Sequence, residues 1–235
     1  MERSELSRIA VLLMGGKGTR LGEELPKQYR LFHHIPLFGY AAKTLCHSSL
    51  IDAVLYVVPQ GDEAKVESFL KEMSLLQKPY WIVPGGASRE ESLKCALLFL
   101  QKQGISSSAI LLCHDAARPN LSEALIETNI EAATKFGAAV TAIPSKDSLA
   151  VSLDGECLSH YLPREEVWRL QTPQTYRFSL IWQAVFSPNT RLEDYTDEGS
   201  LLLAKTKIAP ALVKGDEANY KVTDFSDWER FTKEQ

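Results

Sequence analysis

The chain has 235 residues, 45% of them hydrophobic, and a formal net charge of −4 at pH 7. These values predict one globular domain with a substantial core and argue against a nucleic-acid-binding surface. Any anionic ligand must therefore be met by local clusters of Lys and Arg. The four cysteines form no CxxC pair, which argues against structural zinc and a disulfide framework. The charged start MERSELSR does not resemble a signal peptide, and no apolar run is long enough to span a membrane. We therefore expect a soluble, cytoplasmic protein.

Short apolar runs alternate with stretches of helical periodicity along the whole chain. The apolar runs fall at residues 9–14, 53–58, 80–83, 110–113, 138–143 and 208–213. Helix starts are indicated by a Ser-Arg-Glu-Glu capping box at Ser88, by Ser122, by Thr196-Asp197-Glu198 and by Asp224, and Gly137 ends the helix that Ser122 begins. This alternation predicts a single α/β domain over residues 1–235, with a mostly parallel sheet covered by helices on both faces.

The first apolar run leads directly into a glycine-rich, basic loop, LLMGGKGTRLGEELPKQY, at residues 12–29. Glycine lets the backbone approach a ligand closely. Lys17, Arg20 and Lys27 place three cations beside the glycines, as the oxygens of a polyphosphate require. The spacing fits neither a P-loop nor a dinucleotide fingerprint. The loop is therefore predicted to hold a triphosphate, and the alternative is a surface turn with solvated charges.

Two further turns follow apolar runs and are expected at the same edge of the sheet, where open α/β sheets bind their ligands. Pro84-Gly85-Gly86 is a second turn of close approach, with Arg89 and Ser92 just beyond it. His114-Asp115-Ala116-Ala117-Arg118-Pro119 is the other. Asp115 could hold a ribose hydroxyl or a metal ion, whereas Arg118 could equally pair with phosphate or form a structural salt bridge. His114 is expected to support the turn rather than to act as a base.

Residues 144–173 interrupt the alternation of strands and helices. Polar and apolar residues alternate here around Asp154-Gly155, which is a strong hairpin signal. A hairpin of this size is not stable alone, and its free edges require a partner. We therefore expect residues 144–173 to form an inserted arm that projects from the domain and makes a homodimer. A plain surface hairpin is the alternative.

The motifs form a recognisable series along the chain. LLMGGKGTRL with PKQY, GGASREES, HDAARP, PREEVWRLQTPQ, TDEGS and ANYKVT follow one another from about residue 9 to residue 228. This series resembles the 2-C-methyl-D-erythritol 4-phosphate cytidylyltransferase family. HDAARP, TPQ and KVT are specific in combination, whereas GGxGTRL alone indicates only the wider sugar-nucleotide class. The resemblance implies a Rossmann-like fold of the nucleotide-diphospho-sugar transferase type.

The resemblance also implies roles for individual residues. Arg20 and Lys27 match the pair that stabilises charge on the triphosphate, and Arg164 and Lys221 match the pair that positions the methylerythritol phosphate. The substrate-binding residues that it implies are Gly15, Gly16, Gly18, Gly85, Ser92, Asp115, Ala116, Arg118, Ser148, Thr172 and Thr196. Arg164 and Ser148 lie in the arm and would complete the site of the partner subunit.

The implied reaction joins CTP to 2-C-methyl-D-erythritol 4-phosphate and releases pyrophosphate, a step of the non-mevalonate isoprenoid pathway. Mg²⁺ is the expected cofactor, bound mainly through the CTP phosphates. Ala218 replaces the Asp usual in the last motif, which weakens any claim that this loop ligates the metal. Two alternatives remain: a ribitol 5-phosphate cytidylyltransferase and a non-catalytic nucleotide-binding module of the same fold. The presence of all four implied catalytic cations speaks against the second.

Overall fold

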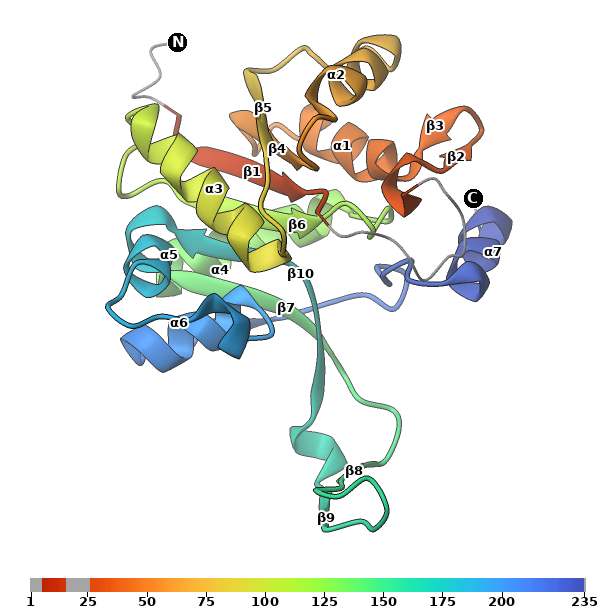
Figure 1. The fold of residues 1–235 in the computed structure, drawn as a ribbon, viewed down its shortest axis with the longest axis vertical. Coiled ribbons are helices and arrows are strands. Elements are labelled where there is room, and N and C mark those ends of the chain that lie inside the picture. Colours follow the sequence, from red (N-terminus) through yellow and green to blue (C-terminus); the bar gives the residue numbers. More distant parts are fainter. Residues whose placement is uncertain (1–5, 16–25, 235) are drawn as a thin grey trace.

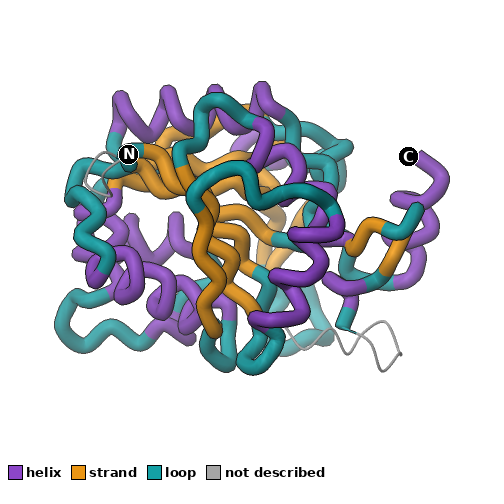
Figure 2. Tube along the Cα trace, turned by 90° about the horizontal axis from the view of Figure 1, so that it is seen from above, coloured by secondary structure: helices purple, strands orange, loops and turns teal. Residues whose placement is uncertain are grey.

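The computed structural model describes residues 6–15 and 26–234, and it has a central sheet between two layers of helices (Figures 1 and 2). Within these residues the main sheet has seven strands in the order β11-β7-β10-β6-β1-β4-β5. Their bounds are β1 Arg8–Leu13, β4 Ala53–Val58, β5 Tyr80–Pro84, β6 Ile110–Asp115, β7 Ala138–Pro144, β10 Trp168–Arg177 and β11 Ala211–Lys214. Only β10 runs antiparallel to its neighbours, β6 and β7. The predicted mostly parallel α/β fold is confirmed.

Helices cover both faces of this sheet. The first hydrophobic cluster joins the sheet to α1 Leu37–His47, α2 Glu63–Glu72 and α4 Glu123–Phe136, and the second joins it to α3 Arg89–Lys102, α5 Phe178–Val185 and α6 Glu198–Thr206. Along β1, Ala10 and Leu12 belong to the first cluster, whereas Val11 and Leu13 belong to the second. Because both faces are buried, the strand is a continuous apolar run. No helix in the described ranges is long and apolar enough to cross a bilayer.

The predicted helix starts are confirmed by their caps. The Ser88 hydroxyl accepts a hydrogen bond from the Glu91 N–H at 3.1 Å, and the Asp197 carboxylate accepts one from the Ser200 N–H at 2.8 Å. Ser122 caps α4, which ends at Gly137 with a left-handed φ of 86°. Asp224 accepts from the Asp227 N–H at the start of α7, Phe225–Glu234. Such side-chain acceptors satisfy N–H groups that the helix itself leaves unpaired.

Two strands differ from the sequence-based expectation. β10 lies in the middle of the sheet, although proline within a run usually argues against a central strand. Its pairing with β7 shifts register between Leu170 and Gln174, and this irregularity accommodates Pro173. Residues 168–173, expected in the arm, therefore belong to the main sheet. β11 begins only at Ala211, directly after Pro210, rather than at residue 208.

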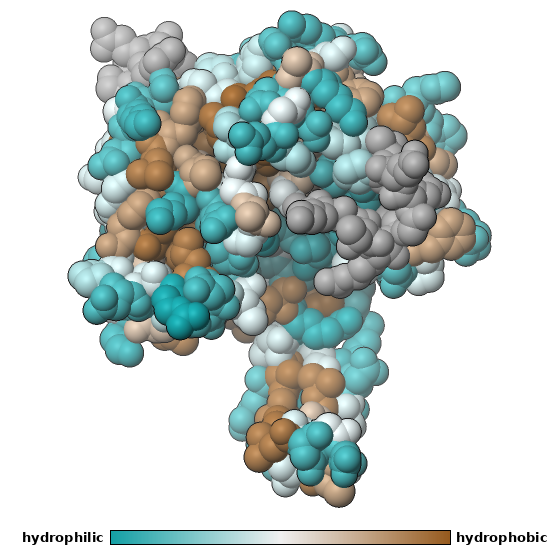
Figure 3. All heavy atoms as spheres, viewed as in Figure 1, coloured by the Kyte–Doolittle hydropathy of each residue, from teal (hydrophilic) through white to brown (hydrophobic). Residues whose placement is uncertain are grey.

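A small hairpin extends away from the body of the molecule (Figure 1). It consists of β8 Leu149–Val151 paired antiparallel with β9 His160–Leu162, and the short helix η4 Arg164–Glu166 follows. Leu153 and Tyr161 on this hairpin are 86% and 70% exposed. Figure 3 shows hydrophobic residues gathered on this projecting segment. Its role in dimerisation stays a prediction.

A third, smaller hydrophobic cluster lies beside the main body. It joins Phe32 and the start of α1 to the C-terminal helix α7 and the segment before that helix. Phe32 belongs to a two-stranded hairpin of β2 Leu31–Phe32 and β3 Ile35–Pro36. Phe231 of α7 is fully buried against Leu37 and Val222. The cluster buries Val222, the neighbour of Lys221, and the Val222 carbonyl accepts a hydrogen bond from Lys27 of the short helix η3 Lys27–Tyr29. A second short helix, η5 Leu192–Asp194, precedes α6.

Candidate active site

The candidate site lies where the parallel strands β1, β5 and β6 end. Met14 and Gly15 follow β1, Gly85 follows β5, and Asp115 ends β6. A cavity of about 240 Å³ opens beside the end of β6, lined by Arg89, Asp115, Arg118, Leu170, Gln171, Thr172, Gln174, Thr196, Asp197 and Lys221. Five of the predicted substrate and catalytic residues therefore share one cavity: Asp115, Arg118, Thr172, Thr196 and Lys221.

Asp115 is held between two cations. Arg89 Nε donates to Asp115 Oδ1 at 2.8 Å, and Lys221 Nζ donates to Asp115 Oδ2 at 2.8 Å. Burial alone would raise the pKa of Asp115, but the charges of Arg89 and Lys221 hold it well below its usual range. Both carboxylate oxygens are thus engaged within the protein. Lys221, which in isolation would be expected on the solvated surface, is fixed at the cavity by this pair.

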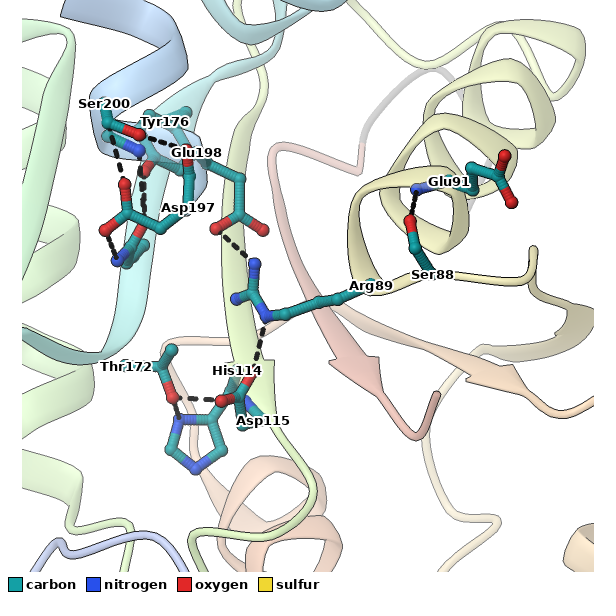
Figure 4. A network of polar contacts seen from close by, with 12 residues as sticks. Ser88, Arg89, Glu91, His114, Asp115, Thr172, Tyr176, Asp197, Glu198 and Ser200 are labelled. Carbon is teal, nitrogen blue, oxygen red and sulfur yellow. Dashed lines mark hydrogen bonds and ion pairs between the residues drawn. The ribbon is translucent and has the colours of Figure 1, made fainter. Parts of the chain in front are cut away.

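His114 and Thr172 form a hydrogen-bonded chain beneath the cavity (Figure 4). His114 Nε2 lies 3.0 Å from the Arg118 carbonyl, which can only accept, so this nitrogen carries the proton. His114 Nδ1 is then an acceptor for the Thr172 hydroxyl at 3.0 Å. The Thr172 oxygen in turn accepts from the Asp115 N–H at 3.1 Å. Burial lowers the pKa of His114 to about 4, so the imidazole is neutral and supports the turn.

Arg118 joins two segments of the site through their backbones. Its guanidinium donates to the Asn219 carbonyl at 2.8 Å and to the Leu170 carbonyl at 3.4 Å. Asn219 Nδ2 donates to the Thr172 carbonyl at 2.7 Å, which closes the link. In the described ranges Arg118 makes no salt bridge. Its structural role is instead to connect two backbone segments by hydrogen bonds to their carbonyl groups. Its contact with a substrate phosphate stays a prediction.

The glycine turns pack around Ser92. The Ser92 hydroxyl donates to the Ser88 carbonyl at 2.8 Å and accepts from the Gly86 N–H at 3.2 Å. A Cβ atom on Gly85 would lie 2.6 Å from Ser92 Oγ, and one on Gly15 would lie 3.0 Å from it. These positions therefore favour glycine because the turns approach Ser92 closely. Ser92 is 1% exposed, and its predicted contact with a substrate stays a prediction.

Lys27 lies next to the segment that carries Lys221. Its ammonium donates to the Val222 carbonyl at 2.9 Å, and the Val222 N–H donates to the Ala117 carbonyl at 2.8 Å. Two lysines from distant parts of the sequence are thereby brought to one edge of the sheet. Ala116 is buried and donates its N–H to the Leu13 carbonyl. The predicted residues Gly16, Gly18 and Arg20 lie outside the described ranges.

Comparison with known proteins identifies the family. Residues 9–231 match the family model described as "IspD: 2-C-methyl-D-erythritol 4-phosphate cytidylyltransferase". The chain belongs to this family. A member from Thermotoga neapolitana is 38% identical over 221 residues, covering 94% of this chain and 93% of that protein. A member from Thermosipho africanus is 31% identical over 219 residues, covering 93% and 94%.

A solved structure has the same fold. The 4-diphosphocytidyl-2C-methyl-D-erythritol synthase from Anaerococcus prevotii superimposes with a TM-score of 0.81 at 24% identity, covering 97% of this chain and 98% of that one. Two site residues expected from the family resemblance, Arg164 and Ser148, are exposed in or beside the projecting hairpin and do not line the cavity of their own chain. Their assignment to a partner's site stays a prediction.

The sequence places Arg89 just beyond the Gly85-Gly86 turn but indicates no role for it at the site of this cytidylyltransferase family member. Arg89 also lies within the capping box at Ser88, and that pattern indicates only the start of a helix. One signal was available: a cation in the first turn of a helix opposes the helix dipole, so its position needs another explanation. The cavity is also lined by Gln171, which lies within the range expected for the arm, and by Gln174, the last residue of the TPQ motif.

Proposed function

We propose that the protein transfers the cytidylyl group of CTP to 2-C-methyl-D-erythritol 4-phosphate and releases pyrophosphate. Membership of the family over residues 9–231 supports this proposal. The observation that carries it is the pair of lysines at the carboxyl edge of the sheet. Lys221 is held by Asp115 at a cavity, and Lys27 is held by the carbonyl of the next residue, Val222.

In the proposed reaction, a phosphate oxygen of the acceptor attacks the α-phosphorus of CTP, and the bond from that phosphorus to the pyrophosphate oxygen breaks. The attacking phosphate is already ionised near neutral pH, so it needs no general base. The protein contributes by positioning both substrates and by stabilising charge. Lys221 would hold the acceptor phosphate in the cavity. Lys27, together with Arg20, would stabilise the negative charge that grows on the leaving pyrophosphate.

Mg²⁺ is proposed to enter with CTP as the metal–nucleotide substrate. Asp115, the cavity carboxylate at the end of β6, already has one cation on each oxygen. The described ranges hold no group of three His, Cys, Asp or Glu side chains that could bind a metal ion. This donor set favours an ion coordinated by phosphate oxygens, where it would neutralise part of the triphosphate charge.

The protein is further proposed to act as a homodimer through its projecting hairpin. The exposed Leu153, Leu158 and Tyr161 give this hairpin an apolar surface, which a second subunit would cover (Figure 3). Arg164 is exposed beside it and would reach the partner's site.

The test is a comparison of two acceptors. Pyrophosphate release from CTP is measured with 2-C-methyl-D-erythritol 4-phosphate and with ribitol 5-phosphate, each over a range of concentrations. The proposal predicts a kcat/KM at least about a hundredfold higher for the methylerythritol acceptor, as expected for a site that hydrogen-bonds one polyol specifically. A preference for ribitol 5-phosphate would assign the protein to the alternative reaction. No release with either acceptor would indicate a non-catalytic module.

A further inference from the structure

Arg89 is the first residue of α3, where its charge is unfavourable for the helix. The N-terminus of a helix carries partial positive charge, so a cation in the first turn is repelled. Glu90 and Glu91 follow it directly and offset this repulsion. The Arg89 side chain points away from α3 and spans the space between β6 and α6 (Figure 4). Its position is therefore explained by what it contacts.

Arg89 bridges two buried carboxylates. Its Nη1 lies 2.6 Å from Glu198 Oε2, and its Nε donates to Asp115 Oδ1 at 2.8 Å. Asp115 then receives Lys221 Nζ on its other oxygen. Four alternating charges thus run from Glu198 inside the protein, through Arg89 and Asp115, to Lys221 at the cavity.

Glu198 depends on Arg89 for compensation of its charge. It is 2% exposed, and in the described part of the chain its carboxylate oxygens have no polar partner beyond the Arg89 guanidinium. The nearby Tyr176 hydroxyl donates to Gln174 instead. A buried carboxylate needs a cation, so Glu198 fixes one end of the Arg89 guanidinium. Arg89 lines the cavity, whereas Glu198 does not.

We propose that Arg89, anchored by Glu198, is a positioning residue for the acceptor phosphate, acting through Asp115 on Lys221. Arg89 offsets part of the negative charge of the Asp115 carboxylate. Asp115 therefore orients the Lys221 ammonium without fully neutralising its positive charge. Without Arg89, the carboxylate would pair with Lys221 alone and draw the ammonium away from the phosphate. The inference rests on the proposed function, and it adds two residues to the acceptor site.

The test uses the double variant Arg89→Gln/Glu198→Gln, which removes both charges and leaves no lone buried carboxylate. The control is Arg191→Gln/Glu193→Gln, which removes an ion pair of the same kind, 3.1 Å apart, that is exposed on the surface. For both variants and the wild type, thermal unfolding, KM for CTP, KM for the acceptor and kcat are measured. Calorimetric titration with inorganic phosphate adds a readout that needs no turnover.

The double variant is expected to unfold near the wild-type temperature and to keep its KM for CTP within about twofold. Its KM for the acceptor should rise at least about tenfold, and its affinity for inorganic phosphate should fall by a similar factor. The control should match the wild type throughout. If the double variant keeps both the acceptor KM and the phosphate affinity of the wild type, the pair is only structural and the inference is wrong. A wild type without turnover would refute the proposed function, and the phosphate titration would still decide the role of Arg89.

Discussion

At the scale of single residues, His114 makes the stability of the protein depend on pH. Its pKa is lowered from 6.5 to about 4 by burial. Between these values the unfolded chain binds a proton that the folded chain does not, so stability falls as the pH falls from 6.5 towards 4. The loss approaches about 3 kcal/mol at the lower end.

The measurement is urea unfolding at several pH values, on the wild type and on His114→Gln. Glutamine can still donate to the Arg118 carbonyl but does not titrate. We expect the variant to be less stable near pH 7 but to lose less stability between pH 6.5 and pH 4.5. Equal losses in the two proteins would show that His114 does not govern this range.

Lys27 and Arg20 are expected to act on turnover rather than on folding. Lys27→Ala and Arg20→Ala should each slow turnover by about a hundredfold or more, equivalent to about 3 kcal/mol, because charge on the leaving pyrophosphate develops only in the transition state. Their KM for CTP should change less. Steady-state kinetics check this, with the exposed Lys102→Ala as a control. Near wild-type turnover in both variants would contradict the assigned roles.

At the scale of elements, the turn between β5 and α3 is expected to approach the nucleotide. Gly85→Ala would place a Cβ 2.6 Å from Ser92 Oγ, whose hydrogen bonds hold the turn. We expect the KM for CTP to rise about tenfold because the turn must shift to relieve this contact. The wild type should also prefer CTP to ATP. An unchanged KM in Gly85→Ala would show that this turn does not shape the nucleotide site.

The elements also show what could be predicted from sequence. Strands β1, β4 and β6 were found because burial on both faces makes them continuous apolar runs, and the starts of α3, α4 and α6 were found because their capping residues act locally. β10 was missed because its pairing is non-local and its Pro173 resembles a break. For the same reason sequence periodicity could not find the Arg89–Glu198 pair, whose partners lie on different helices.

At the scale of the whole molecule, the projecting hairpin is expected to complete a neighbouring site. Inactive Arg164→Ala protein is mixed with inactive Lys27→Ala protein under conditions that allow subunit exchange. If Arg164 serves the partner, each mixed dimer has one fully intact site, and random exchange should restore up to about a quarter of wild-type activity. No recovery, despite exchange proven by tagged subunits, would mean that Arg164 serves its own subunit or no site.

The central claim is that this chain joins CTP to 2-C-methyl-D-erythritol 4-phosphate, and the most direct measurement follows the phosphorus atoms. Phosphorus-31 NMR of the wild-type protein with Mg²⁺, CTP and the acceptor shows reactants and products together. We predict that the acceptor phosphate signal and the triphosphate signals decay in step, while a diphosphate diester and pyrophosphate appear in equal amounts. Pyrophosphate or inorganic phosphate without the diester, or an unchanged acceptor signal, would contradict it.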